Sequence, residues 1–183
     1  MADSLGDPTP RNHGRMTLNP FKHLDRTGMF MLLIFGFGWA TTPVNPSMLR
    51  GNKRASMALV AVAGPIANLI MLAIFGLFMR LDLTGSLPTF LDNNFFDTLW
   101  RIGVFFNALL FVFNMLPIPP LDGFTILTGI LPADLAYRLM PLRQYGMMIL
   151  MGAIFLLPMV GFDFFGLILT PFIDFVFGII RGY

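Results

Sequence analysis

Residues 55–79 read ASMALVAVAGPIANLIMLAIFGLFM, a run of 25 residues without a charged side chain. A helix needs about 20 apolar residues to cross a hydrocarbon core roughly 30 Å thick, so this run is long enough to span a membrane. Because this run is uncharged and long enough for a spanning helix, it predicts that the chain folds within a bilayer.

The composition of the whole chain supports a membrane fold. Of its 183 residues, 56% are hydrophobic and 12% are charged, and the mean hydropathy is +0.73. A water-soluble domain carries about 25% charged residues. The net charge of +2 is too small and too scattered for nucleic-acid binding. The chain has no Cys, which excludes disulfides and thiolate metal sites, and all ten of its acidic residues are Asp.

The predicted fold is an all-α polytopic membrane protein with four spanning helices. The predicted spans are residues 55–79, 102–121, 145–162 and 164–180. The last two spans are separated at Asp163, contain Pro158 and Pro171, and are expected to pair as a helical hairpin. We therefore expect a transmembrane core over residues 55–183.

A cytoplasmic segment is predicted over residues 1–54. Its apolar stretch 28–40 has only about a dozen residues, too few to span, so we expect a membrane-dipping element over residues 28–46. Seven Lys and Arg residues precede the first span, whereas the stretch 80–101 has two. Because cytoplasmic loops retain Lys and Arg, both termini and the loop 121–145 are predicted to be cytoplasmic.

The second predicted span runs into Asn114-Met115-Leu116-Pro117-Ile118-Pro119-Pro120-Leu121-Asp122-Gly123. Three prolines in four positions predict that the helix ends there and that Asp122 follows on non-helical backbone. A carboxylate in the middle of a membrane costs ~2.5 to 3.5 kcal/mol on insertion scales. Two interpretations stay open. Asp122 either bonds backbone N–H groups at the interface, or it is a metal ligand or proton carrier that lines a cavity.

Other polar residues are weaker candidates for a catalytic or metal-binding role. Asn114 is either a contact between helices or a hydrogen-bond donor to a reacting carbonyl. Asp174 is expected to have a structural role. His13 and His23 are ten positions apart, whereas a helical zinc pair needs i and i+4 spacing, so they are not expected to form a metal pair. The small residues of the stretch 63–68 are expected to pack against another helix.

Several short motifs follow one another in a fixed order. They are Leu5-Gly6-Asp7-Pro8-Thr9, Gly14-Arg15-Met16-Thr17-Leu18-Asn19-Pro20 with His23 and Asp25, Gly38-Trp39-Ala40 with Pro43-Val44-Asn45-Pro46, Ala63-Gly64-Pro65-Ile66-Ala67-Asn68, and the stretch 114–123. This ordered set, which extends from Leu5 to about Leu131, closely resembles the site-2 protease family of intramembrane zinc metalloproteases. The likeness is greatest to the compact prokaryotic members without a PDZ domain.

The resemblance implies an enzyme that uses zinc-activated water to cleave the transmembrane segments of other proteins. In that family, two His of an HExxH motif and the Asp of an LDG motif, here Asp122, hold the zinc, and the HExxH Glu is the general base. Asn114 would then be an oxyanion donor. The extended residues Thr42, Pro43, Val44 and Asn45 would pair with an unwound substrate strand.

This sequence departs from the family at one essential point, because it contains neither HExxH nor any Glu. The residues shown are therefore expected to bind zinc poorly and to be inactive by themselves. One hypothesis is a longer protein in which HExxH precedes Met1. A second is a pseudoprotease that binds transmembrane segments without cleaving them. A third, resting on Asp122, Asp174 and the broken helices, is a small transporter, although no inverted repeat is visible. The expected partners are a transmembrane substrate and the lipids of a prokaryotic cell membrane.

Overall fold

The computed structural model describes residues 1–17, 19, 30, 42–86 and 94–182. Every regular element in these ranges is a helix, which confirms the all-α prediction. Four helical stretches in the same ranges are long and apolar enough to cross a membrane. They are Lys53–Leu83 (α3), Asn94–Met115 (α4), Ala133–Met159 (α6 to α8) and Phe164–Arg181 (α9). Most of the predicted membrane-dipping element lies outside the described residues.

The chain divides into two compact units, Met1–Val60 and Ala61–Tyr183. The first unit contains the short helices Asp3–Leu5 (η1), Thr9–Asn12 (α1) and Pro46–Met48 (η3), followed by the first residues of α3. Asn52 caps the start of α3, because its side-chain oxygen accepts hydrogen bonds from the N–H groups of Arg54 (3.1 Å) and Ala55 (3.3 Å).

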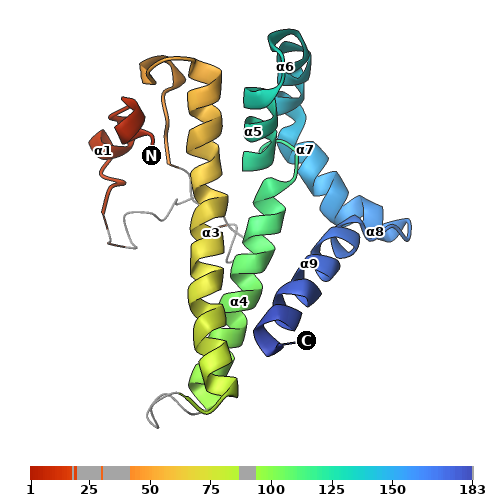
Figure 1. Cartoon of the computed structure of the whole chain (residues 1–183). Helices are drawn as coiled ribbons and strands as arrows, with labels where there is room; N and C mark the ends of the chain where they lie inside the picture. The colour runs from red at the N-terminus through yellow and green to blue at the C-terminus, as the bar shows by residue number, and fades with distance from the viewer. Residues whose placement is uncertain (18, 20–29, 31–41, 87–93, 183) are drawn as a thin grey trace. The chain divides into compact units, whose positions relative to one another are not determined.

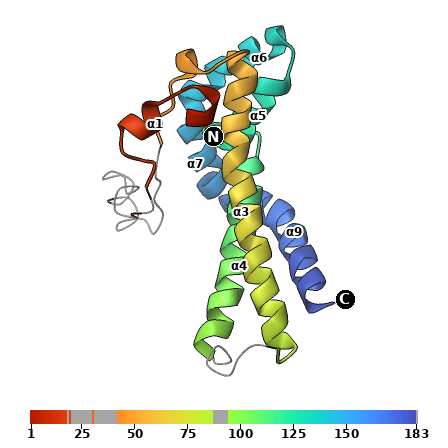
Figure 2. The same ribbon diagram turned by 60° about the vertical axis from the view of Figure 1, so that its left-hand side comes forward.

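In the second unit, α4 packs against α3 on one side and α9 on another (Figures 1 and 2). The centre of this packing is Trp100, whose ring stacks on Phe78 of α3 at a centroid distance of 4.8 Å. The Phe75 ring occupies the space that a side chain at Gly103 would fill, so the glycine lets α3 and α4 approach closely. The buried members of this cluster are Met79, Trp100, Val104, Val176 and Ile180.

The predicted loop 121–145 is instead helical. It contains Asp122–Ile130 (α5), Ala133–Leu139 (α6) and Met140–Tyr145 (η4). Consequently, the third spanning stretch begins at Ala133, ahead of the predicted residue 145. The second span ends at Met115 rather than residue 121, because Pro117, Pro119 and Pro120 cannot continue the helix.

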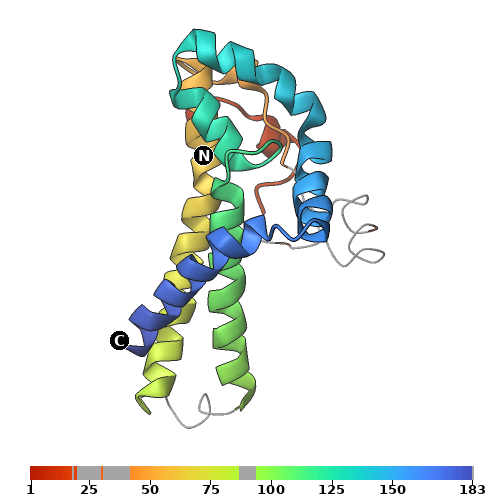
Figure 3. The ribbon, with the colours of Figure 1, turned by 90° about the vertical axis from the view of Figure 1, so that its right-hand side faces the viewer.

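The third span continues through Gly146–Met151 (α7), a π-helical turn at Gly152–Leu156 (η5) and Leu157–Met159 (α8). The chain then turns at Gly161, whose φ of +81° is readily adopted by glycine. Asp163 begins α9 by accepting a hydrogen bond from the N–H of Gly166 at 2.8 Å. Figure 3 shows the change of chain direction between α7 and α9.

Candidate functional site

A proline-rich loop over residues 116–121 joins α4 to α5 and is held by packing on several sides. Leu116 and Leu121 are buried with Leu150 of α7 in a cluster that also includes Phe165 of α9. Gly146 of α7 lies so close that a Cβ there would be 2.9 Å from the Pro119 carbonyl carbon. The loop that precedes Asp122 is therefore fixed between α4, α7 and α9.

The far end of the loop is fixed by the start of α5. Gly123 packs directly on the carbonyl groups of Met115 and Leu116, a position that leaves no room for a side chain. On the outer surface of α5, Arg143 donates a hydrogen bond to the Thr125 hydroxyl (3.2 Å) and lies over the Phe124 ring, 5.8 Å from its centroid. These contacts determine the position of the first turn of α5.

Asp122 is the first residue of α5, with Leu121 as its N-cap. The prediction of non-helical backbone at Asp122 was therefore wrong, because the helix resumes directly after the prolines and a carboxylate is favoured in a first turn. The Asp122 side chain is half-buried, and no described residue donates a hydrogen bond to it. Burial raises the pKa of this carboxyl group above its ordinary value.

Gly64 of α3 faces the Asp122 carboxylate. A Cβ placed on Gly64 would lie 2.9 Å from Oδ2 of Asp122, closer than real Cβ atoms approach other atoms. The missing side chain therefore lets the carboxylate pack directly against α3. Gly64 belongs to the small-residue stretch that the sequence assigned to helix packing. The signal in the sequence was a Gly-Pro pair inside a spanning helix.

The surroundings of Asp122 fit the role of a single metal ligand. A carboxylate is an oxygen ligand that zinc accepts, and that of Asp122 has no hydrogen-bond donor among the described residues. Among the described residues, no group of three or more His, Cys, Asp or Glu side chains is placed to hold a metal ion. Within that part of the chain, Asp122 could supply one ligand and the described residues do not complete a set.

The other predicted site residues that the structure describes lie outside α5. Asn114 is half-buried in the last turn of α4, and Asp174 is exposed on α9. His13 is exposed at the end of α1. His23 lies outside the described residues.

The predicted substrate-pairing residues Thr42–Asn45 have no regular secondary structure and end at η3. Asn45 has extended backbone, with φ −101° and ψ 103°. Its side-chain oxygen accepts hydrogen bonds from the N–H (3.1 Å) and hydroxyl (2.7 Å) of Ser47. The Lys53 ammonium group donates to the carbonyls of Ser47 (2.8 Å) and Leu49, which ties the turn to the start of α3.

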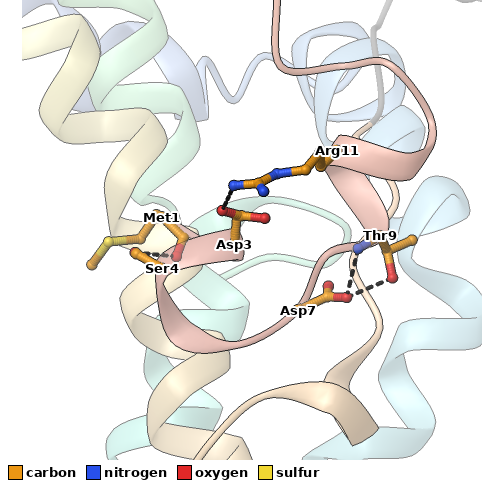
Figure 4. A network of polar contacts seen from close by, with 6 residues as sticks. All are labelled: Met1, Asp3, Ser4, Asp7, Thr9 and Arg11. Atoms are coloured by element: carbon orange, nitrogen blue, oxygen red, sulfur yellow. Dashed lines mark hydrogen bonds and ion pairs between the residues drawn. The ribbon is translucent and has the colours of Figure 1, made fainter.

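No role was predicted for Asp7, yet its side chain is completely buried. Its carboxylate accepts hydrogen bonds from the Thr9 hydroxyl (2.5 Å), the Thr9 N–H (3.0 Å) and the Asn45 N–H (2.7 Å); the two bonds from Thr9 are drawn in Figure 4. Burial raises the pKa of Asp7, but these hydrogen bonds together outweigh it, so the pKa lies below its ordinary value. Asp-Pro-Thr is a recognisable turn sequence, but nothing in it points to Asn45.

The fold and the site define a polytopic helical membrane protein with a half-buried carboxylate at the start of α5. No family model and no solved structure matches the chain. It is 37% identical over 157 residues to “Putative zinc metalloprotease YwhC” of Bacillus subtilis, covering 81% of this chain and 68% of YwhC. The chain belongs to the site-2 protease family, which confirms the resemblance in its sequence motifs.

Two mycobacterial relatives are also named as zinc metalloproteases. The chain is 30% identical over 175 residues to “Putative zinc metalloprotease Rip2” of Mycobacterium tuberculosis, covering 90% of this chain and 62% of that protein. It is 28% identical over 152 residues to the Rip2 of Mycolicibacterium smegmatis, covering 79% and 55% respectively. The chain thus spans between about half and two thirds of the length of these relatives.

Proposed function

We propose that this chain is part of an intramembrane zinc endopeptidase that cleaves the transmembrane segments of other proteins. The observation that carries the proposal is the half-buried Asp122 carboxylate, which packs against Gly64 and receives no hydrogen bond from the described residues. A polar group in such a place is stabilised when it binds a cation. The zinc metalloprotease names of the relatives support zinc as that cation.

In this proposal Asp122 is the carboxylate ligand and Gly64 makes room for its side chain beside α3. Zinc held there would supply a water of lowered pKa and a Lewis acid for the scissile carbonyl. Asn114 donates a hydrogen bond to the oxyanion. The remaining ligands and the general base come from outside residues 1–183, because this sequence has no HExxH and no Glu. More of the same polypeptide or a partner chain can supply them.

The proposed substrate is a transmembrane helix that unwinds locally, since a helix hides its carbonyl groups from attack. Residues Thr42–Asn45 would pair with the unwound strand and hold it by backbone hydrogen bonds. The location proposed for the reaction is a prokaryotic cell membrane, with both termini of the chain in the cytoplasm.

The test compares Asp122→Ala with the parent in the complete gene product, purified from membranes. We expect Asp122→Ala to abolish cleavage of a reporter transmembrane substrate and to lower zinc content, because the site loses its carboxylate ligand. Asp174→Asn is the matched control, since Asp174 is exposed on α9 and should leave both measurements unchanged. Full cleavage by Asp122→Ala would overturn the metal assignment. The pseudoprotease hypothesis would then lead, because it requires substrate binding alone.

A further inference from the structure

We propose that Asp7 is a positioning residue that holds the segment Thr42–Asn45 extended and so presents it to an unwound substrate strand. This inference rests on the proposed function, because it deepens the substrate-binding role of that segment. The evidence for it lies entirely within the first compact unit, Met1–Val60.

The two oxygens of Asp7 bind different parts of the chain. Oδ1 accepts from the N–H (3.0 Å) and hydroxyl (2.5 Å) of Thr9, which closes a local turn (Figure 4). Oδ2 accepts from the Asn45 N–H at 2.7 Å, across 38 positions of sequence. A buried carboxylate with donors on both oxygens makes strong, directional contacts. Asp7 therefore fixes the end of the segment relative to the N-terminal turn.

A second contact between the two stretches lies next to the Asp7–Asn45 hydrogen bond. The N–H of Arg50 donates to the Leu5 carbonyl at 2.8 Å. Gly6 has a φ of +102°, which favours glycine, and a Cβ there would lie 2.8 Å from Cγ of Arg50. The stretches 5–7 and 45–50 are thus joined at two neighbouring points.

The polar groups of Asn45 are used in hydrogen bonds, whereas, in the described part of the chain, the backbone groups of Thr42 and Val44 are not. The Asn45 N–H donates to Asp7, its carbonyl accepts from the Met48 N–H (3.1 Å), and its side chain caps η3. Within the described ranges, no hydrogen bond uses the backbone groups of Thr42 and Val44. A short extended segment that is fixed at one end and has unpaired backbone groups is suited to strand addition.

Substitution of Asp7 by Asn tests whether both carboxylate oxygens are needed. Asn has nearly the same shape as Asp but only one acceptor oxygen. Asp7→Asn therefore cannot keep the Thr9 turn and the Asn45 contact together. Because Thr9 supplies two donors and Asn45 one, we expect the single oxygen to stay with Thr9 and the Asn45 contact to be lost. Thr9→Val is the matched control, because it removes the hydroxyl donor and leaves the Thr9 and Asn45 N–H groups in place.

The experiment measures two quantities in the complete gene product. The first is the KM and kcat for a reporter transmembrane substrate, with zinc content determined on the same samples. The second is the crosslinking yield from Val44→Cys to that substrate, which needs no cleavage. The introduced thiol is the only one among residues 1–183, because this sequence has no Cys.

We expect Asp7→Asn to raise KM about 10- to 100-fold, the range for losing a hydrogen bond to a charged group. The crosslinking yield at subsaturating substrate should fall in parallel, while kcat and zinc content stay near those of the parent. Thr9→Val should change KM by no more than about threefold, since the contact with Asn45 remains.

Two results would overturn the inference. One is an Asp7→Asn protein with the KM and crosslinking yield of the parent. The other is a parallel loss of kcat, zinc and folding, which would reveal a general structural role. If the parent itself does not cleave, yet Asp7→Asn still weakens crosslinking, the protease proposal fails and the positioning role stands.

Discussion

Gly64 of α3 and Asp122 of α5 lie against each other. Oδ2 of Asp122 is 2.9 Å from the point where a Cβ of residue 64 would be. The contact joins two of the motifs that carry the family resemblance, the small-residue stretch of α3 and the LDG sequence at the start of α5. It gives the glycine a role at the carboxylate in addition to helix packing.

Gly64→Ala should therefore impair the site without weakening the helix. Ala is more favourable than Gly inside a helix by about 0.5 to 1 kcal/mol, so thermal stability should hold or rise. The added methyl group meets the Asp122 carboxylate, so zinc content and cleavage should fall. Gly152→Ala is the control, because a Cβ there would meet only Cδ1 of Leu156, at an ordinary contact distance of 3.9 Å. Unchanged zinc content in Gly64→Ala would show that the carboxylate does not bind metal from this side.

Asn114→Ala tests the assignment of the oxyanion donor. Loss of one such donor lowers turnover by something like 10²- to 10³-fold, and zinc should remain bound because Asn114 is not a proposed ligand. The control on the same helix is Asn107→Ala, whose amide donates to the Gly103 carbonyl at 2.8 Å. Equal effects of the two substitutions on turnover would assign Asn114 to helix structure.

The Asp7 contacts should weaken in acid. The pKa of Asp7 is lowered in the folded chain, so its contribution to stability is complete above the ordinary carboxyl pKa, about 3.9. That contribution is lost as the pH falls through the lower, folded value. Hydrogen exchange at the Asn45 amide should show protection that decreases over this acidic range.

Asp7→Asn is the control for this acid response, because the neighbouring Asp3–Arg11 ion pair (2.6 Å) and the Arg50 side chain against Gly6 remain. Protection in that variant should be low at every pH. An acid response that survives in Asp7→Asn would assign it to Asp3.

Cysteine labelling tests the topology. Ser47 and Ser86 are exposed and lie on either side of α3, so cysteines at these positions should react from opposite faces of the membrane. We expect Ser47→Cys to react from the cytoplasm. Ala133→Cys, placed after α4, should react from the same face as Ser47→Cys. Labelling of Ser47→Cys and Ser86→Cys from one face would exclude α3 as a span.

The spanning helices were predictable because each is marked by a long apolar run of its own sequence. An uncharged run such as 55–79 needs no knowledge of its neighbours to be identified as a span. The helices within 121–145 were missed because α5 and α6 have only nine and seven residues. Segments this short have no membrane-length signal, and their helicity depends on burying residues such as Phe124 and Ala136.

The candidate site was predictable in part for the same reason. Asp122 could be selected because a carboxylate after a proline break in an apolar chain is costly wherever it lies. The roles of Gly64 and Asp7 depend on contacts with α5 and with Asn45, which only the folded chain brings together. A single sequence does not encode such pairs in any local pattern.

The unpartnered carboxylate of Asp122 also has a consequence for laboratory evolution. Without metal, a half-buried charge that receives no hydrogen bond from the described residues destabilises the fold, so replacing it with Leu or Asn should be favourable. A library of variants selected for heat resistance alone would then enrich substitutions at this position, while selection for proteolysis would retain Asp. Opposite enrichment under two selections marks a residue kept for function at the expense of stability.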